Sequence, residues 1–264
     1  MDLHLRGRSA LISGGSKGIG RAAAESLAAE GCDLVLVSRT LATLEETAVA
    51  IRARHQVSVR VRAADLSVQG AAEDLSAQFP DVDILVNNAG AIPGGSLAQV
   101  DGTTWRQAWQ LKVFGYIDLC RAFYPLLKAR SSPAFIPCIV NVIGNAAETL
   151  DHAHICGVTG NAALYAFTRS LGGAAPNDGL RVVGLSPGPV ATDRLVGLMR
   201  RKAADRRGDP ERWQELFASM PFGRAATPQE IGDMIAFLAS PRSSFTSGTI
   251  VTIDGGMAAR SRAF

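Results

Sequence analysis

The chain has 264 residues, of which 47% are hydrophobic and 19% charged, and its formal net charge at pH 7 is +3. This length and composition predict one compact α/β domain over residues 1–264, and so mild a charge gives no reason to expect a nucleic-acid partner. No apolar run approaches the ~20 residues that a membrane helix needs, and the four cysteines are scattered without a C-x-x-C pair. We therefore expect a reduced, cytoplasmic protein with no membrane association and no metal site.

Apolar runs and helical patterns alternate along the chain. Strand patterns lie at 9–13, 33–38, 57–61, 83–86, 139–143, 180–185 and 249–253, and the segment 33–38 is a continuous apolar run, as expected of a strand buried on both faces. Helical composition or spacing marks 21–30, 40–54, 67–79, 104–129 and 159–171. This alternation predicts a Rossmann-type doubly wound parallel sheet of about seven strands, with a ligand in the crevice at the carboxyl ends of the strands.

A glycine-rich turn joins the first predicted strand to the first predicted helix. Gly14, Gly18 and Gly20 stand in it with the spacing G-x-x-x-G-x-G. Such a turn lets backbone N–H groups at the start of the helix point at a phosphate, where the helix dipole favours negative charge. The turn alone is weak evidence, because a purely structural turn can need the same glycines.

Later motifs, in order and with matching spacing, make the whole chain resemble the classical short-chain dehydrogenase/reductase family. Beside the glycine turn, these motifs are Asp65-Leu66, N-N-A-G at 87–90, P-G-x-V-x-T at 187–192 and D-G-G at 254–256. The resemblance implies a nicotinamide dinucleotide cofactor and a homodimer or homotetramer. The cofactor-binding residues it implies are Gly14, Ser16, Lys17, Gly18, Ile19, Gly20, Ser38, Arg39, Asp65, Leu66, Asn88, Ala89, Gly90, Pro187, Gly188, Val190 and Thr192.

Charge at the end of the second predicted strand favours NADP over NAD. By the resemblance, NAD-specific members carry an acidic residue there, whereas this chain has Ser38 followed by Arg39, with Lys17 in the glycine turn. Two cations suit a phosphate dianion, and arginine offers it a planar fork of donors. The alternative is that Arg39 is a solvated residue at a helix start. We expect NADP.

The catalytic residues that the resemblance implies are not in place. The Ser, Tyr and Lys of the family fall on Gly144, Gly157 and Asn161, and the supporting Asn falls on Lys112. A positioned general acid is worth about 10²–10⁴ in rate, and an oxyanion-type donor roughly 10²–10³. Ordinary ketone reduction by the standard residues is therefore excluded.

Two residues are candidates for the missing chemistry. His154 stands three residues before the glycine that replaces the tyrosine, and histidine is the natural proton donor near neutral pH. Lys112 can return a positive charge to the site, because the Asn it replaces touches, by the resemblance, the water chain that leads to the lysine of the family. The alternatives are a surface-loop histidine and a solvated helix lysine.

Two glycines lie near the start of the helix predicted after this loop. Each glycine costs a helix interior about 1 kcal/mol relative to alanine. Because Gly157 and Gly160 stand in this stretch, we expect the helix to fray or to begin late, with Thr159 or Asn161 as its N-cap. A late start would enlarge the pocket.

Residues 193–221 occupy the place of a mobile substrate lid in the family. The segment holds an excess of basic residues, which suits an acidic substrate such as a carboxylate or an acyl-coenzyme A. The alternative is an amphipathic lid helix with solvated charges.

Three functions stay open, and we favour the first. It is an NADP(H)-binding oxidoreductase that acts on a carbonyl or hydroxyl group of a small molecule through a non-standard proton relay. The second is a catalytically silent NADP-binding sensor or partner subunit. The third is a non-redox lyase or isomerase, which would leave the nucleotide motifs unused.

Overall fold

A seven-stranded parallel sheet forms the centre of the computed structural model, which describes residues 1–260. The strands lie in the order β3-β2-β1-β4-β5-β6-β7. Their bounds are β1 Ser9–Ser13, β2 Asp33–Ser38, β3 Val59–Ala63, β4 Ile84–Asn87, β5 Cys138–Val142, β6 Arg181–Pro187 and β7 Ile250–Ile253. The predicted doubly wound sheet is confirmed, and the strand order reverses direction between β1 and β4, where such folds bind ligands.

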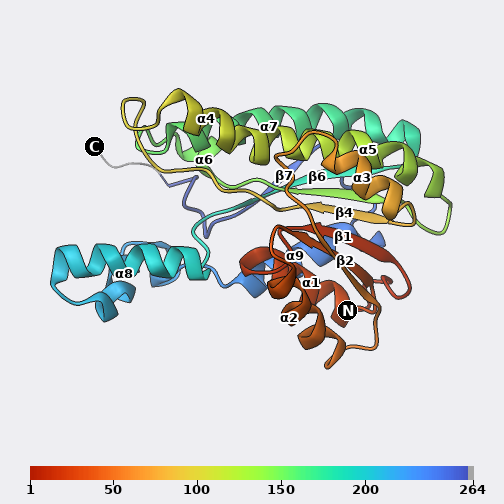
Figure 1. Cartoon of the computed structure of the whole chain (residues 1–264), viewed down its shortest axis with the longest axis horizontal. Helices are drawn as coiled ribbons and strands as arrows, with labels where there is room; N and C mark the ends of the chain where they lie inside the picture. The colour runs from red at the N-terminus through yellow and green to blue at the C-terminus, as the bar shows by residue number, and fades with distance from the viewer. Residues whose placement is uncertain (261–264) are drawn as a thin grey trace.

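Helices cover both faces of the sheet (Figure 1). One face carries α1 Gly18–Ala29, α2 Leu41–Arg52 and α9 Pro228–Ala239, and the other carries α3 Ala71–Gln78, α4 Gly102–Trp109, α5 Gly115–Arg130 and α7 Ile155–Ala174. Sequence reasoning missed α9. Its signal was a proline at the first helical position and a capping box between Thr227 and Glu230. Among the helices of residues 1–260, none combines the length and hydrophobicity that a bilayer crossing needs.

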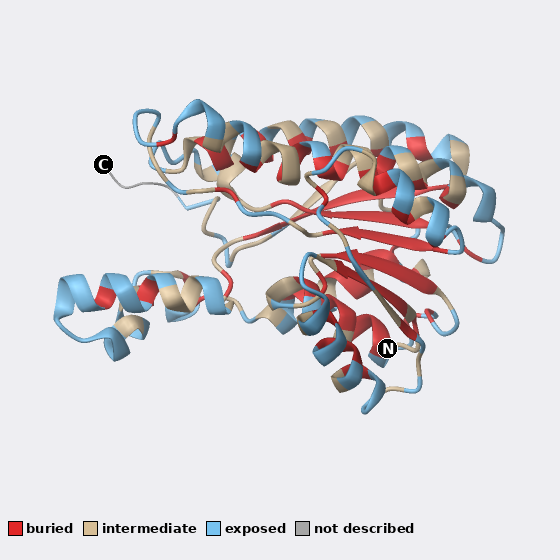
Figure 2. Cartoon of the chain, viewed as in Figure 1, coloured by how far each residue is buried: buried red, intermediate tan, exposed pale blue. Residues whose placement is uncertain are grey.

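The inner strands β1, β2, β4, β5 and β6 are mostly buried because each face of the sheet packs against a helical layer, whereas the edge strands β3 and β7 are partly exposed (Figure 2). Along β1, Ala10 and Ile12 belong to the core cluster that includes α1 and α9, whereas Leu11 belongs to the cluster that includes α3 and α5. Successive side chains of a strand point to opposite faces, which produces this division. Continuous apolar runs were therefore a sound signal for these strands.

The helix predicted at 104–129 is interrupted by a π-helical turn, η1 Gln110–Phe114, between α4 and α5. Lys112 is the middle residue of this turn and is buried. Single π-helical turns inside α-helices are frequent at functional sites.

The expected late start of the next helix is wrong, because α7 begins at Ile155 with His154 at the N-cap position. Gly157 and Gly160 lie buried inside it. A Cβ at Gly160 would stand 3.2 Å from Trp109 Nε1, and a Cβ at Gly157 would overlap the His154 ring. Close packing against these side chains offsets the low helix propensity of glycine, so neither Thr159 nor Asn161 caps the helix.

Residues 193–217 form an arm that projects from the body of the molecule (Figure 1). It consists of α8 Asp193–Arg207 and the 3₁₀ segment η3 Pro210–Phe217. Thr192 caps α8 by accepting a hydrogen bond from Leu195 N at 3.5 Å. Met199 and Phe217 join the two segments in a small apolar cluster, so the arm has a core of its own.

Candidate functional site

The glycine turn between β1 and α1 has the backbone that a phosphate needs. Gly14 and Gly18 have φ values of 69° and 53°, which L side chains rarely adopt. A Cβ at Gly20 would overlap the carbonyl oxygen of Gly14. Lys17 is the N-cap of α1 but makes no side-chain cap bond, so the first N–H groups of the helix are available to an anion.

Asn88 and Ser13 hold this turn against the segment that follows β4. Asn88 Nδ2 donates to Ser13 O at 3.0 Å and to Gly14 O at 3.3 Å. Ser13 Oγ accepts from the backbone N–H groups of Asn88 at 2.9 Å and Ala89 at 3.1 Å. These bonds fix the position of the glycine turn relative to residues 88–90.

A cavity of about 500 Å³ opens at the carboxyl ends of the central strands. Many of the predicted cofactor residues line it, namely Gly14, Lys17, Gly18, Ile19, Asn88, Ala89, Gly90, Pro187, Gly188, Val190 and Thr192. Further wall residues are Lys112, Val142, Ile143, Gly144, Pro189, Asp193, Arg194 and Leu195. The structure therefore brings together the glycine turn, the segments after β4, β5 and β6, and the start of α8.

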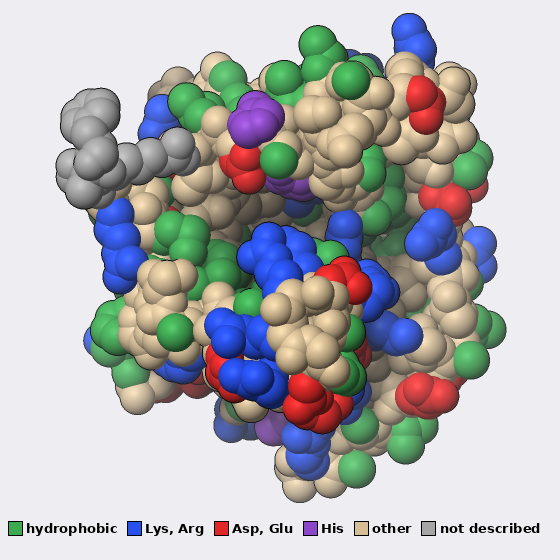
Figure 3. Space-filling view, turned by 90° about the vertical axis from the view of Figure 1, so that its left-hand side faces the viewer, with side chains coloured by type: hydrophobic (Ala, Val, Ile, Leu, Met, Phe, Trp, Pro, Cys, Tyr) green, Lys and Arg blue, Asp and Glu red, His purple; other side chains and the backbone are tan. Residues whose placement is uncertain are grey.

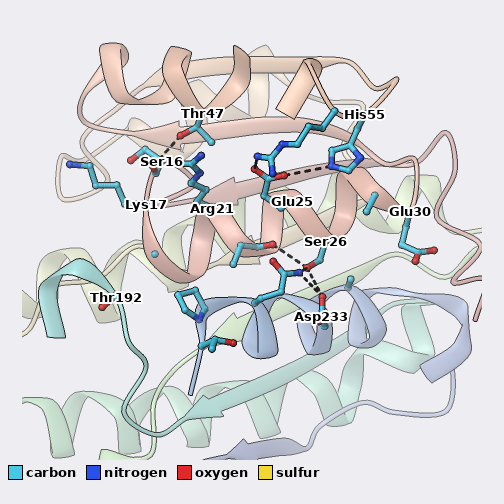
Figure 4. Close-up of a pocket in the computed structure, with 18 of the residues that line it drawn as sticks. Ser16, Lys17, Arg21, Glu25, Ser26, Glu30, Thr47, His55, Thr192 and Asp233 are labelled. Carbon is cyan, nitrogen blue, oxygen red and sulfur yellow. Dashed lines mark hydrogen bonds and ion pairs between the residues drawn. The ribbon is translucent and has the colours of Figure 1, made fainter. Parts of the chain in front are cut away.

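A larger cavity of about 940 Å³ adjoins it along α1 (Figure 4). Lys17, Gly18 and Thr192 line both cavities. Figure 4 shows Ser16 and Lys17 at one end of the larger cavity, where Thr47 Oγ1 donates to Ser16 O at 3.1 Å. The predicted residue Ser16 therefore faces this larger space.

The remaining predicted cofactor residues lie outside both walls. Ser38 ends β2 beside Ala63 of β3, and its buried Oγ has no hydrogen-bond partner among residues 1–260. Asp65 Oδ1 accepts from Ser67 N at 3.0 Å and from Ser67 Oγ at 2.7 Å. These bonds, and more weakly Arg39, lower the pKa of Asp65. Arg39 is exposed.

The predicted cofactor residues Gly20 and Leu66 are buried. Leu66 packs its side chain in the core beside α3 and α5. A contact with a cofactor would therefore use its main chain.

Lys112, from the π-helical turn η1, belongs to the wall of the 500 Å³ cavity. Its side chain is 7% exposed, and Nζ donates to Val142 O at 2.7 Å and to Tyr116 Oη at 2.8 Å. A Cβ at Gly90 would stand 2.5 Å from Lys112 Cδ, so the glycine makes room for the chain. No carboxylate within residues 1–260 forms an ion pair with Lys112, and burial lowers its pKa from 10.5 to about 7.

His154 is the N-cap residue of α7 and is half-buried, and it is not among the residues that line the 500 Å³ cavity. A Cβ at Gly157 would overlap its Nε2, so the imidazole occupies the space directly over that glycine. Burial lowers the pKa of His154 and Arg194 lowers it further, while Asp151 and a hydrogen bond to the main chain of Pro93 act in the opposite direction.

The comparisons with known proteins agree with this geometry. The family model described as enoyl-(acyl carrier protein) reductase matches residues 14–258. The chain belongs to the short-chain dehydrogenase/reductase family. It is 30% identical to galactitol 2-dehydrogenase (L-tagatose-forming) of Cereibacter sphaeroides, over 96% of this chain and 95% of the relative.

Two solved structures of short-chain dehydrogenase/reductases are similar to this chain over nearly its whole length. The L-sorbose reductase of Gluconobacter frateurii complexed with NADPH and L-sorbose has a TM-score of 0.91 at 29% identity, covering 99% of this chain and 100% of that one. The NADPH-bound short chain oxidoreductase of Pseudomonas aeruginosa PAO1, containing an atypical catalytic center, has a TM-score of 0.84 at 28% identity, with coverage of 97% and 98%.

None of the three tyrosines of this short-chain dehydrogenase/reductase lines the 500 Å³ cavity. The Tyr165 hydroxyl bonds to Glu148 Oε1 at 2.9 Å and to Ser186 Oγ. Tyr124 donates to Asp178 at 2.9 Å. Tyr116 is fully buried and donates to Val142 O at 2.8 Å. No tyrosine side chain therefore faces this cavity.

Asn161, on which the lysine of the family falls by the resemblance, contacts Gly144 of the cavity wall. Its Nδ2 donates to Gly144 O at 3.2 Å, and a Cβ at Gly144 would stand 3.1 Å from the same nitrogen. Its Oδ1 is buried without a hydrogen-bond partner among residues 1–260. Sequence reasoning missed Tyr116, although it stands four residues after Lys112 and so follows it by about one turn.

Proposed function

We propose that this chain is an NADP(H)-dependent oxidoreductase that interconverts a carbonyl and a hydroxyl group on a small molecule, with His154 as the proton-transfer residue. The observation that carries the proposal is the His154 ring over Gly157, near enough to Arg194 of the cavity wall for the two charges to interact. In this arrangement an ionisable ring fills the space in which a side chain at position 157 would begin. The NADPH complexes of the two similar structures support the choice of cofactor.

The residues present fit an NADP molecule. Side chains at Gly14 and Gly20 would close the phosphate turn, and the uncapped start of α1 offers N–H donors. Arg39 and Lys17 supply cations for a ribose 2′-phosphate, and the unpartnered Ser38 Oγ can bond a ribose hydroxyl. When bound, the cofactor supplies a hydride in the reducing direction and accepts one in the oxidising direction.

His154 handles the proton of this reaction. In reduction, a hydride and its electron pair add to the carbonyl carbon, the π pair moves to oxygen, and the imidazolium gives that oxygen its proton. Because His154 is half-buried, it can regain a proton from water. In oxidation, the neutral imidazole removes the hydroxyl proton. The lowered pKa of His154 keeps much of it neutral near pH 7, which suits this second direction.

Lys112 contributes positive charge. In its protonated form, two of its three N–H donors bond to Val142 O and Tyr116 Oη, so one remains for the cavity. A fixed cation in a buried site stabilises the negative oxygen that develops during reduction. With a pKa of about 7, the group changes charge near neutral pH.

Turnover of NADPH with a panel of ketones and aldehydes tests the proposal. We expect His154→Ala to lower kcat by about 10²–10⁴, the value of a positioned acid, without changing the Kd for NADPH. His152→Ala is the matched control, since His152 belongs to the same loop and its side chain is 92% exposed. Equal rates for wild type and His154→Ala would remove the proposed role.

A silent NADP-binding sensor or partner subunit is the second candidate, because no tyrosine lines the cavity. Tight NADPH binding without turnover of any carbonyl or alcohol would favour it. Product formation without added nucleotide would favour a lyase or isomerase.

We also propose that the chain assembles as a homodimer or homotetramer. Phe114, the last residue of η1, is a large apolar side chain exposed in the single chain. Sedimentation analysis tests the assembly, and a monomer at micromolar concentration would contradict it.

A further inference from the structure

Arg194 is a cation at the wall of the 500 Å³ cavity without a carboxylate partner among the described residues. It is the second residue of α8, and Nη2 donates to Ile92 O at 3.0 Å. This bond joins the start of the arm to the segment after β4. Within residues 1–260, Arg194 forms no ion pair with an aspartate or glutamate. Arg194 is exposed, and one hydrogen bond orients its guanidinium while most of its five N–H donors stay free.

The other basic residues of the arm differ from Arg194. Figure 3 shows basic side chains gathered around the projecting arm, beside a hollow in the molecular surface. Arg200 pairs with Glu211, and Arg207 and Arg212 pair with Glu215. Apart from Arg194, no arginine or lysine of residues 193–221 lines the cavity. The basic residues of this segment thus lie mostly on an ion-paired or solvated outer surface. Only Arg194 among them contributes a charge to the cavity wall.

The charges around the cavity favour an anion even when Lys17 is reserved for the cofactor. Lys112 and Arg194 contribute basic groups to the wall, and Asp193 contributes an acidic one. His154 lies near enough for Arg194 to affect its proton affinity. An anion bound to Arg194 would offset this repulsion and help the imidazole to hold the proton that reduction consumes.

We propose that Arg194 binds the carboxylate of the substrate, so that the substrates are oxo acids and the corresponding hydroxy acids. The planar guanidinium matches a carboxylate with two parallel hydrogen bonds, and the bond to Ile92 O holds it in place for that contact. The balanced reaction is oxo acid plus NADPH plus a proton to hydroxy acid plus NADP⁺. This inference rests on the proposed oxidoreductase activity.

The test compares each acid with its neutral analogue. The probes are 2-oxobutanoate, 3-oxobutanoate and 4-oxopentanoate, each beside its primary amide. We expect the wild type to prefer at least one acid in kcat/KM, and Arg194→Gln to lose roughly 10–100-fold on that acid, as for a lost charged hydrogen bond. Its kcat/KM on the amide should change little, and Arg194→Lys should recover part of the loss. The matched control is Arg200→Gln, which changes a paired arginine on the outer side of the same helix.

Two further measurements separate the possible failures. If Arg194→Gln raises the Kd for NADPH and leaves the acid-to-amide ratio unchanged, Arg194 serves the cofactor and the inference is overturned. Equal losses on acid and amide overturn it as well. If the wild type turns over none of the probes, calorimetric titration of the acids into the NADP⁺-loaded protein tests the carboxylate site by itself. Acid binding that is present in the wild type and lost in Arg194→Gln supports the site although the proposed activity fails. If no acid binds to the wild type, the site is contradicted.

Discussion

The contact between His154 and Gly157 leads to an unusual expectation for Gly157→Ala. A Cβ at this position would lie closer to His154 Nε2 than the 3.0 Å that real Cβ contacts keep. The nearest atoms all belong to the imidazole, which can rotate away, so the backbone has no reason to move. Replacing glycine by alanine inside a helix gains up to about 1 kcal/mol. The variant should therefore fold well but lose the position of its proton-transfer residue.

We expect Gly157→Ala to lower kcat by about 10²–10⁴. Its Tm should stay equal or rise by roughly 2–4 °C, the shift that 1 kcal/mol gives in a chain of similar size. The assays are NADPH oxidation with an accepted carbonyl substrate and thermal unfolding followed by circular dichroism. Adding His154→Ala to this variant should lower kcat little further, because both changes remove the same group.

Gly173→Ala is the matched control for this prediction. Gly173 belongs to the same helix, and a Cβ there would have no heavy atom within 4 Å. It should raise stability by up to about 1 kcal/mol and leave kcat unchanged. Full activity of Gly157→Ala would refute the reasoning, since the ring would then be displaced without effect on the reaction.

Three more predictions concern charge. Reduction should slow as pH rises through the pKa of His154, which lies below 6.5, because the donor must be protonated. Between pH 7 and 10 the unfolded chain holds a proton on Lys112 that the folded chain has lost, so the free energy of unfolding should rise with pH. Urea unfolding of the wild type and of Lys112→Met at several pH values measures this rise, which should be smaller in the variant. Arg39→Ala should raise the Kd for NADPH roughly 10–100-fold, because charged hydrogen bonds are lost, and should leave the Kd for NADH unchanged. Fluorescence titration measures both constants, and equal effects on the two cofactors would contradict the NADP assignment.

Most of the fold could be predicted from the sequence, because strands packed between two helical layers, such as β2, are apolar over most of their length. β1 and β2 begin and end at the predicted residues, and the other strands lie within two residues of their predicted bounds. The start of α7 could not be predicted from the sequence, since the low helix propensity of Gly157 and Gly160 indicates a late start. Contacts with residues far away in the sequence, such as Trp109, decide it instead.

The site followed only in part. Motif spacing predicted the phosphate turn and the segments that line the cavity with it. Spacing could not show that the His154 ring lies over Gly157, because that depends on how the chain enters the helix. Nor could it show that Lys112 donates a hydrogen bond to Val142 O, thirty positions away. Lys112 lies in a π-helical turn, and such a turn has no simple sequence signal. The isolation of Arg194 from the acids of its own helix was likewise visible only in three dimensions.

The most direct test of the central claim is chemical rescue of His154→Ala in single-turnover reduction. Removing the side chain leaves space over Gly157, and free imidazole added to the buffer can enter it from solvent. We predict a slow rate without imidazole that rises with the concentration of imidazolium, while His152→Ala behaves as the wild type throughout. A rate equal to that of the wild type before any imidazole is added would contradict the claim that His154 moves the proton.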